Sequence, residues 1–569
     1  MRVLFLVHSF NSLTQRLFVA LRDAGHEVSV EFDVNPETTI GAVELYRPDL
    51  IVAPFLKRAI PEPVWRSNIC FVVHPGIVGD RGPSALDWAI LDGESEWGVT
   101  VLQANDEMDA GDVWATRSFP MRAASKASLY RTEVTAAAVE ALLEAVERFT
   151  DSEFEPVPLD AIADAKGRQR PLARQADRRI DWRADSSERI LRKIHSADGF
   201  PGLEARLLER DVLLYDARPA PGHSGPEGTV VGTSGAALLV GTRDGAIWVG
   251  HLRDKRSKHP FKLPATRVMQ DRIAGLPEFP VDSEAGYREI RVDARDDVVF
   301  LHFDFYNGAM SADQCERLRA SFDAARARQP RVIVLAGGHD FWSNGMHLNC
   351  IEAGESPAEE SWRNINAIDD LALDIIGATE CLTVAALSGN AGAGGVFLAR
   401  AADEVWSHGD VVLNPHYKDM GNLYGSEYWT YLLPRYCGEE RARLIMEARL
   451  PMGIREALEL GLVDKCIANG RRGFANELER EVQGLAGCPR YGRRIEAKQA
   501  RRLADEKHKP LAEYRLDELD RMRSNFFGFD PSYHVARYNF VHKVPRSRTP
   551  LTLAVHRRAG HLPDVRQAS

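Results

Sequence analysis

The sequence contains few cysteines and no long apolar run. The seven cysteines among 569 residues are scattered and never spaced as Cys-x-x-Cys, which argues against a disulfide framework and against a structural zinc site. No stretch reaches the roughly 18 consecutive apolar residues that a membrane span needs. These absences predict a protein of the reducing cytoplasm that holds no metal and enters no membrane.

An excess of positive charge is also missing. The net charge is −10 at pH 7, which argues against general nucleic-acid binding. The hydrophobic and charged contents, 44% and 27%, are ordinary for a globular protein. The apolar start, residues 1–7, is short and is followed by a helical pattern instead of a small-residue cleavage site. We therefore expect a buried first strand and not a signal peptide.

The length requires several domains, because a single core rarely serves more than about 300 residues. Polar stretches at 160–172 and 275–285 have the composition of linkers. We expect an α/β protein with a Rossmann-like domain, a small OB-like β-barrel, a second α/β domain and a helical extension. The expected bounds of these parts are 1–165, 166–278, 286–490 and 491–569.

The first part alternates strand and helix patterns. Strands are expected over 3–7, 27–32, 50–54 and 70–73, and helices over 13–24 and 136–149. This rhythm predicts an open, mostly parallel sheet. Ligands of such sheets bind beyond the carboxyl ends of the strands, which is where His74 falls.

The later parts carry different patterns. Residues 205–252 form short alternating segments between Gly/Pro turns, which predicts the small barrel. A second α/β layer structure, wound differently, begins near residue 287. Its strands are expected over 298–302, 331–335 and 381–387, and its helices over 312–327 and 396–402. The last 80 residues are charged and largely helical in pattern, and we expect them to pack back on the body.

A histidine and an acidic loop carry the first candidate site. His74 ends an apolar strand, and Asp109 lies in the turn-forming segment 106–112. A histidine at such an edge can serve as general acid or base near pH 7, and a carboxylate beside it can fix its tautomer. Taken singly, each residue is more simply interpreted as a solvated group.

Together with Arg81-Gly82, these residues resemble the formyltransferases that use 10-formyltetrahydrofolate, such as methionyl-tRNA formyltransferase. The resemblance covers residues 1–275 and implies that His74 and Asp109 are the catalytic pair, with Arg81 in the cofactor loop. Two features depart from that family: its asparagine is Val72 here, and the loop from His74 to Arg81 is one residue shorter. Val72 cannot donate to a formyl oxygen. Either another donor replaces the asparagine or the formyl acceptor is unusual, and both argue against simple tRNA formylation.

Two glycine-rich segments carry the second candidate site. The first spans 337–345 and includes Ser343 and Asn344, and the second spans 388–395 and includes Gly394. Glycine allows close backbone approach, and a following helix adds a positive dipole. With the segment 457–464, they resemble the oxyanion loops of crotonase-type acyl-CoA enzymes over residues 288–490. The resemblance implies that Asn344 and Gly394 are the N–H donors for a thioester carbonyl.

The catalytic carboxylates of crotonase hydratases are missing. Phe397 and His416 occupy their positions, so water cannot be added to a double bond by the usual route. A cluster of proton-carrying residues follows, and we predict Tyr417 and Glu427 as the new acid/base pair, with His416 as a further candidate. The alternative interpretation is that the tyrosines are core aromatics with satisfied hydroxyls.

A cofactor as long as coenzyme A also needs partners for its phosphates. Gln15 and Arg16 begin the first predicted helix, an ordinary place for an anion, and Arg131 lies early in a later helix. We predict these three residues as cofactor-binding. The basic run 253–258 is better interpreted as a solvated face.

The whole chain resembles the hydrogenase maturation factors of the HypX (HoxX) family. This resemblance implies two cofactors, 10-formyltetrahydrofolate and coenzyme A, and a route in which formyl-CoA is decarbonylated to supply carbon monoxide for NiFe hydrogenase. It also implies NiFe-hydrogenase maturation proteins as partners. Two alternatives stay open: a hydrolase that releases formate, and a non-catalytic scaffold that binds folate and coenzyme A.

Overall fold

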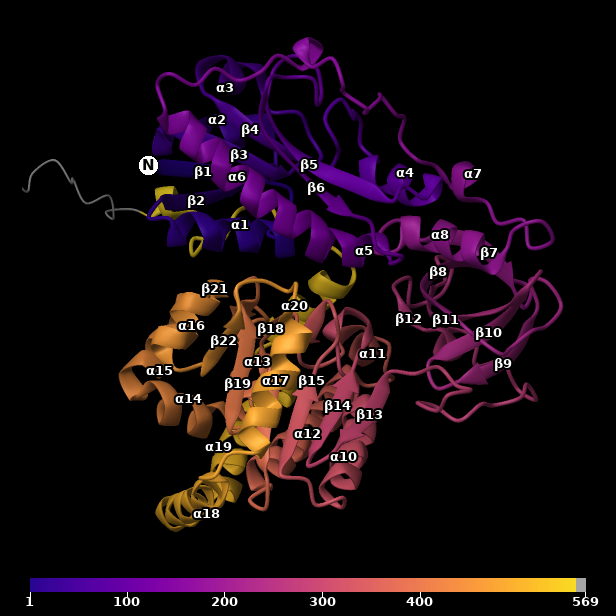
Figure 1. The fold of residues 1–569 in the computed structure, drawn as a ribbon, viewed down its shortest axis with the longest axis vertical. Helices are drawn as coiled ribbons and strands as arrows, with labels where there is room; N and C mark the ends of the chain where they lie inside the picture. Colours follow the sequence, from indigo (N-terminus) through magenta and orange to yellow (C-terminus); the bar gives the residue numbers. More distant parts are fainter. Residues whose placement is uncertain (559–569) are drawn as a thin grey trace, which may run out of the picture. The chain divides into compact units, whose positions relative to one another are not determined.

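The computed structural model describes residues 1–558, which form two compact units (Figure 1). Unit 1 contains residues 1–205 and the C-terminal segment from Pro545, and unit 2 contains Arg206–Val544. Among residues 1–558, no helix combines the length and the apolar character needed to cross a bilayer.

Unit 1 is built on a six-stranded sheet in the order β2-β1-β3-β4-β5-β6. Its first four strands are parallel, and β5 and β6 run antiparallel to their neighbours. The strands are β1 (Arg2–Val7), β2 (Glu27–Phe32), β3 (Leu50–Phe55), β4 (Cys70–His74), β5 (Glu96–Gln103) and β6 (Val113–Pro120). The predicted mostly parallel sheet is confirmed, as is the interpretation of the apolar start as a strand.

Unit 1 also contains helical segments, and several of them contact the strands of this sheet. They are α1 (Ser12–Asp23), α2 (Pro36–Tyr46), α3 (Glu62–Ser67), α4 (Ala85–Asp92), α5 (Lys126–Leu129), the π-helical turn η1 (Tyr130–Val134), α6 (Thr135–Thr150), η2 (Leu159–Ala161), α7 (Gln175–Arg178) and α8 (Ser187–Ala197). The Asn11 side chain caps α1 by accepting from the Thr14 N–H at 3.0 Å, which satisfies one of the helix's unpaired donors. The predicted helices over 13–24 and 136–149 are confirmed as α1 and α6.

The C-terminal segment returns to the edge strand β2 of unit 1. The Val30 N–H donates to the Leu553 carbonyl at 3.1 Å, and η4 (Val555–Arg557) follows. Glu31 of β2 is fully buried and accepts hydrogen bonds from Thr549, His556 and Arg557 at 2.6, 2.9 and 2.7 Å. A buried carboxylate satisfied in this way fixes the segment to the sheet.

A six-stranded antiparallel sheet lies at the start of unit 2, and its first strand begins three residues before Arg206. Its strands are β7 (Leu203–Leu207), β8 (Arg210–Pro219), β9 (Val230–Ser234), β10 (Ala237–Thr242), β11 (Gly245–Arg253) and β12 (Leu263–Pro264), followed by α9 (Ala265–Val268). The order β7-β8-β11-β10-β9 leaves β7 and β9 unpaired with each other. The predicted strands are present, but in the described residues they do not close into a barrel. The two-residue strand β12 pairs with β11 on the side of β10, past the end of β10. It therefore does not join β7 to β9, and the sheet stays open.

The second α/β part contains two sheets. The larger has the order β13-β14-β15-β17-β19-β22 and the smaller the order β16-β18-β20-β21. Their strands are β13 (Ile290–Arg295), β14 (Val298–Phe303), β15 (Val332–Ala336), β16 (Phe341–Ser343), β17 (Leu382–Leu387), β18 (Asn390–Gly392), β19 (Glu404–His408), β20 (Val412–Asn414), β21 (Met452–Gly453) and β22 (Lys465–Ala468). This two-sheet arrangement confirms a second α/β structure wound differently from the first.

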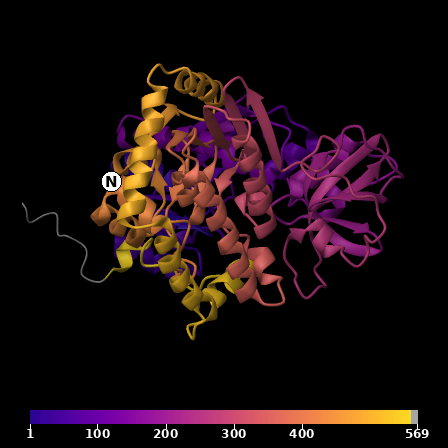
Figure 2. The same ribbon diagram turned by 90° about the horizontal axis from the view of Figure 1, so that it is seen from below.

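Helices pack around these sheets and continue into the C-terminal extension. The body contains η3 (Tyr306–Gly308), α10 (Ala312–Arg326), α11 (Leu348–Glu352), α12 (Pro357–Gly377), α13 (Gly394–Arg400), α14 (Trp429–Cys437), α15 (Glu439–Ala448), α16 (Ile454–Leu460) and α17 (Phe474–Ala486). The extension consists of α18 (Tyr491–His508), α19 (Leu511–Phe527) and α20 (Ser532–Val541). These yellow helices lie along the orange body in Figure 2, and α19 contacts both α12 and α14. The predicted helical extension that packs back on the body is confirmed.

Candidate active sites

In unit 1, His74 is held between two carboxylates. It is the last residue of β4 and only 4% exposed. Its Nε2 lies 3.1 Å from Oδ1 of Asp80, and its Nδ1 lies 3.6 Å from Oδ1 of Asp109. The ring is therefore oriented from both nitrogens, which suits a group that must accept and return a proton in one geometry.

The Arg81-Gly82 motif shapes the Asp109 side of this site. The Gly82 N–H donates to Oδ2 of Asp109 at 3.2 Å, and Asp109 has a left-handed backbone with φ of 55°. The Arg81 guanidinium pairs with Glu107. The predicted pair His74 and Asp109 thus meets in space, with Gly82 positioning the aspartate and Arg81 bound to the same acidic loop.

The sequence analysis missed Asp80. This carboxylate is 2% exposed and lies in the shortened loop directly before Arg81. Gly76 makes room for the arrangement, because a Cβ there would lie 2.3 Å from Nε2 of His74 and 2.8 Å from Oδ1 of Asp80. The only available signal was the one-residue difference in loop length, which did not reveal that a carboxylate would turn toward the histidine.

The predicted phosphate-binding residues of unit 1 lie on neighbouring elements. Gln15 and Arg16 are on α1, and Arg131 is in η1, which contacts α1. The Gln15 side chain donates to the Phe10 carbonyl at 3.0 Å. Their assignment to a cofactor stays a prediction.

In unit 2, the two glycine-rich loops come together. The first contains β16, and the second leads into α13, whose first residue is Gly394. A Cβ on Gly345 would lie 3.4 Å from the Gly394 nitrogen, so the backbones are adjacent. Ala393 before the helix has a positive φ of 48°, a conformation that costs energy in a non-glycine residue and is often found at functional sites.

The backbone N–H of Asn344, the predicted donor on the first loop, has an acceptor within the chain, and its role stays a prediction. The Asn344 N–H donates to the Gly308 carbonyl at 2.7 Å, so it is already engaged. Ser343 supports the loop, since its hydroxyl accepts the Gly345 N–H at 3.1 Å. Within residues 1–558, neither the Met346 N–H nor the Gly394 N–H donates to a backbone carbonyl outside the regular helices and strands. The Met346 N–H, directly after the first loop, is therefore an alternative candidate for the first donor.

Tyr417 and Glu427 form a buried pair beside the second loop. The Tyr417 hydroxyl donates to Oε2 of Glu427 at 2.5 Å, and the two residues are 5% and 1% exposed. A Cβ on Gly394 would lie 2.0 Å from Oε1 of Glu427, so the carboxyl group lies against the oxyanion loop. Phe397 stacks on the Tyr417 ring at 5.4 Å between centroids. The two predicted side chains therefore contact each other beside Gly394, and their acid/base role stays a prediction.

The environment of this pair favours the protonated form of both groups. Burial raises the pKa of Glu427, and the negative charge of Asp369 raises it further. Burial and the nearby Glu427 carboxylate also raise the pKa of Tyr417. A carboxyl group that keeps its proton near neutral pH can act as an acid, and once ionised it is a stronger base than an exposed carboxylate.

His416 lies on the same turn but outside this pair. Burial lowers its pKa, while the nearby Asp419 opposes the shift. Its Nδ1 is buried and has no hydrogen-bond partner in the described chain. His416 directly precedes Tyr417 in the sequence. Among the described residues, its side chain forms no hydrogen bond or ion pair with Glu427, so its catalytic role stays a prediction.

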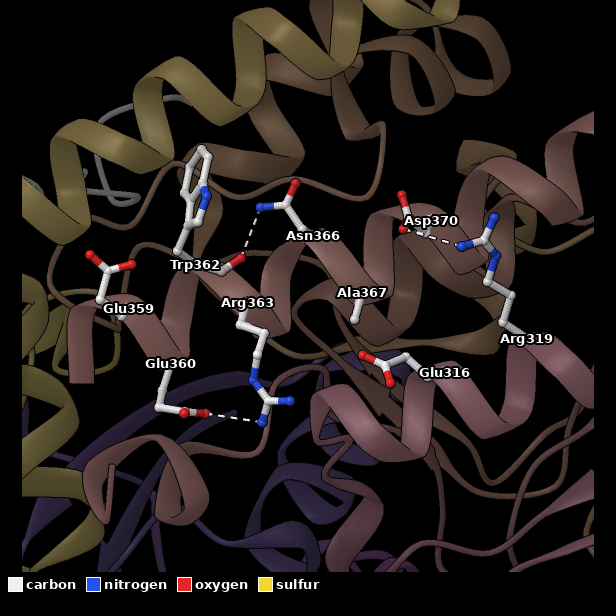
Figure 3. Close-up of a pocket in the computed structure, with 9 residues that line it drawn as sticks. All are labelled: Glu316, Arg319, Glu359, Glu360, Trp362, Arg363, Asn366, Ala367 and Asp370. Carbon is white, nitrogen blue, oxygen red and sulfur yellow. Dashed lines mark hydrogen bonds and ion pairs between the residues drawn. The ribbon is translucent and has the colours of Figure 1, made fainter. Parts of the chain in front are cut away.

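The pocket drawn in Figure 3 is separate from both sites. It has a volume of about 490 Å³ and lies between α10 and α12, with the Arg319–Asp370 ion pair at one end and Trp362 at the other. Neither Tyr417 nor Glu427 lines it. Among residues 1–558, no group of three or more His, Cys, Asp or Glu side chains is arranged to hold a metal ion.

Three segments of the chain match known protein families. Residues 31–146 match the family "Formyl transferase", residues 173–262 match "Formyl transferase, C-terminal domain", and residues 301–490 match "Enoyl-CoA hydratase/isomerase". A methionyl-tRNA formyltransferase of Citrifermentans bemidjiense is 26% identical over 221 residues, which are 38% of this chain and 67% of that protein. The resemblance to formyltransferases and to crotonases is confirmed.

Two relatives match the chain along nearly its whole length. The hydrogenase maturation factor HoxX of Bradyrhizobium diazoefficiens is 56% identical over 557 residues, covering 98% of this chain and 97% of that protein. The crystal structure of HypX from Aquifex aeolicus in complex with tetrahydrofolic acid is 48% identical and superposes with a TM-score of 0.94, over 98% of this chain and 99% of that one. The combination of the two halves on one chain is thus shared with these proteins.

Proposed function

Because the chain belongs to the HoxX (HypX) family of hydrogenase maturation factors, we propose that it makes carbon monoxide from 10-formyltetrahydrofolate. The formyl group passes to the thiol of coenzyme A, and the resulting formyl thioester is then decarbonylated. The carbon monoxide becomes a ligand of the NiFe-hydrogenase iron, and hydrogenase maturation proteins receive it. The observation that carries this proposal is the Tyr417–Glu427 pair against the Gly394 loop.

His74 serves the first step. The thiolate sulfur attacks the formyl carbon, and a C–S bond forms while the C–N10 bond of the folate breaks. His74 accepts the thiol proton and returns a proton to N10, with Asp80 and Asp109 holding its ring from both sides. An acyl transfer of this kind passes through an oxyanion. The tetrahydrofolic acid in the crystals of the Aquifex aeolicus relative supports a folate as the formyl donor.

The Tyr417–Glu427 pair serves the second step. Decarbonylation breaks the C–H and C–S bonds of the formyl thioester and forms an S–H bond, with no net oxidation or reduction. The pair accepts the formyl proton and delivers a proton to sulfur, while the oxyanion loop holds the carbonyl oxygen. Its position beside Gly394 brings the acid/base groups to the carbonyl without any of the glutamates of a hydratase.

The test follows a labelled carbon. The full-length protein is incubated with 10-formyltetrahydrofolate labelled in the formyl group, with and without coenzyme A, and carbon monoxide is detected by the spectrum of reduced haemoglobin. We expect label in carbon monoxide only when coenzyme A is present. Labelled formate in its place would identify a hydrolase, and the absence of any turnover would identify a binding scaffold.

A further inference from the structure

We infer that Asp369 and Glu518 are positioning residues that hold the turn carrying Glu427 in its working conformation. Asp369 comes from α12, and Glu518 comes from α19 of the C-terminal extension. Both are fully buried. This role rests on the proposed function, and it gives the C-terminal helical extension a part in the decarbonylation step.

The turn needs to be held because its backbone is strained. Glu427 and Tyr428 are consecutive residues with φ of 59° each, in the left-handed region where a side chain costs roughly 1–2 kcal/mol. Gly425 before them also has a positive φ, and a Cβ there would lie 2.1 Å from the Tyr417 ring. Three of the four residues 425–428 therefore have a left-handed backbone beside the Tyr417–Glu427 contact.

Asp369 binds the first half of this turn. It accepts the Ser426 hydroxyl at 2.7 and 2.8 Å through its two oxygens, and Oδ1 also accepts the Glu427 N–H at 2.8 Å. Its neighbour Asp370 points the other way, to the pocket of Figure 3, where it pairs with Arg319. Successive residues on a helix point in directions about 100° apart, so α12 presents one aspartate to the turn and the next to the surface.

Glu518 binds the second half. Its Oε2 accepts the Tyr428 N–H at 3.0 Å, and its Oε1 accepts the Thr430 N–H at 2.8 Å and the Thr430 hydroxyl at 2.5 Å. These N–H groups lie at the start of α14. Tyr428 is the N-cap residue of this helix, and its side chain makes no capping hydrogen bond. Through its two oxygens, the Glu518 carboxyl group thus satisfies donors that would otherwise be unpaired at this helix N-terminus.

The same residues set the charge around Glu427. The titratable groups that face Glu427 are Tyr417 from its own loop, Asp369 from α12, Glu518 from α19 and Cys315 from α10. The cation nearest to them is Arg515 of α19, whose Nε lies 4.0 Å from Asp369. A negative charge on Asp369 disfavours ionisation of Glu427, so the clamp that fixes the carboxyl group also helps it to keep its proton.

The first experiment measures carbon monoxide release from formyl-CoA supplied directly to the full-length protein. An amide at position 518 cannot accept both backbone N–H groups, so Glu518→Gln should lower kcat about 10- to 100-fold, the range expected for a displaced catalytic group, with KM little changed. Asp369→Asn should move the pH profile of kcat to lower pH. Glu513→Gln, an exposed glutamate on the same helix, is the matched control and should behave as the native protein.

A second measurement does not depend on catalysis. The infrared band of the protonated Glu427 carboxyl group, identified by its loss in Glu427→Gln, is titrated in the native protein and in Asp369→Asn. We expect the band to disappear at lower pH in Asp369→Asn. If Glu518→Gln does not fold, Ser426→Ala removes one clamp contact and should also lower kcat.

The outcomes separate the two proposals. If the native protein releases no carbon monoxide, the proposed function fails, and the infrared titration alone decides the positioning role. Native carbon monoxide release with unchanged kcat in Glu518→Gln and an unchanged pH profile in Asp369→Asn would overturn the positioning role alone. An unshifted infrared band would overturn it whether or not carbon monoxide forms.

Discussion

The hydroxyl of Tyr417 donates a 2.5 Å hydrogen bond to Oε2 of Glu427, in a place where neither side chain is accessible to bulk water. In such surroundings an ionised carboxylate is poorly solvated, so the protonated form of Glu427 is favoured over the ionised form. The phenol and the carboxyl group can thus move one proton between themselves beside the oxyanion loop.

Replacing Glu427 with Gln should abolish carbon monoxide release and leave formyl transfer from the folate largely intact. The amide keeps the size of the side chain but cannot accept or deliver the proton, and loss of a general acid or base costs about 10²- to 10⁴-fold in rate. Tetrahydrofolate formation and carbon monoxide release are measured on the same sample. Glu440→Gln, an exposed site on α15, is the control, and carbon monoxide release by Glu427→Gln at the native rate would remove Glu427 from the mechanism.

Replacing Asp80 with Asn should impair the first step and not the second. The carboxylate lies 3.1 Å from Nε2 of His74, and an amide there would leave the ring free to be held in the wrong tautomer. We expect the rate of tetrahydrofolate formation to fall at least about tenfold. Carbon monoxide release from added formyl-CoA should be unchanged, and the exposed Asp160→Asn should match the native protein in both assays. Equal loss in the two assays would point to a general folding defect.

A methyl group at Gly76 should displace His74. The Cβ of Gly76→Ala would lie 2.3 Å from Nε2 of His74, closer than real Cβ contacts come, so the ring must move. Formyl transfer should fall about 100-fold, the cost of a misplacement of roughly 1 Å. Gly41→Ala on α2 is the matched control, because nothing lies within 4 Å of its added Cβ. Native activity in Gly76→Ala would mean that the ring is not required in its present position.

Sequence motifs were sufficient to predict the candidate site residues that lie on short, contiguous segments. His74, Asp109 and the Gly394 loop could be placed because the chain preserves the spacing of two known families. The oxyanion donor of the first loop could not be fixed in this way, since the Asn344 N–H is used by Gly308, a contact between segments 36 residues apart in the chain. Loop geometry of this kind depends on the packing of a neighbouring turn and leaves no local signal.

The supporting carboxylates could not be predicted for a similar reason. Asp369 lies 58 residues before Glu427, and Glu518 lies 90 residues after Tyr428. Both occur in charged, amphipathic helical sequence, where an acidic residue is normally solvated. Only the docking of α19 beside α12 turns them inward. The fold class and the order of the elements follow from periodicity, whereas the polar contacts that position the catalytic turn follow from tertiary packing.

Glu31→Gln should destabilise unit 1. Although burial alone would raise the pKa of Glu31, the hydrogen bonds from His556, Thr549 and Arg557 outweigh it and lower that pKa. The stabilisation is therefore present above the ordinary carboxyl pKa and is lost as the pH falls through the lowered value. Removing the charge leaves Arg557 without its partner and should cost about 1–3 kcal/mol at pH 7. Urea unfolding followed by hydrogen exchange of β2 measures it, with exposed Glu44→Gln as control; an unchanged free energy would show that the C-terminal segment is not fixed by this residue.

Unit 2 should become less stable as the pH rises from 5 to 8. Burial, with the charge of Asp369, raises the pKa of Glu518 from 4.5 to about 8, so over this interval the folded protein holds a proton that the unfolded chain has released. Stability is then fully present below pH 4.5 and is lost as the pH rises through 8, with a slope of about 1.4 kcal/mol per pH unit for one proton. Glu518→Gln cannot titrate and should flatten the dependence by one proton, whereas the exposed Glu513→Gln should not. The measurement is the urea dependence of hydrogen exchange in α12 and α19 at several pH values, and equal slopes in native protein and Glu518→Gln would mean that Glu518 is ionised in the folded state throughout this range.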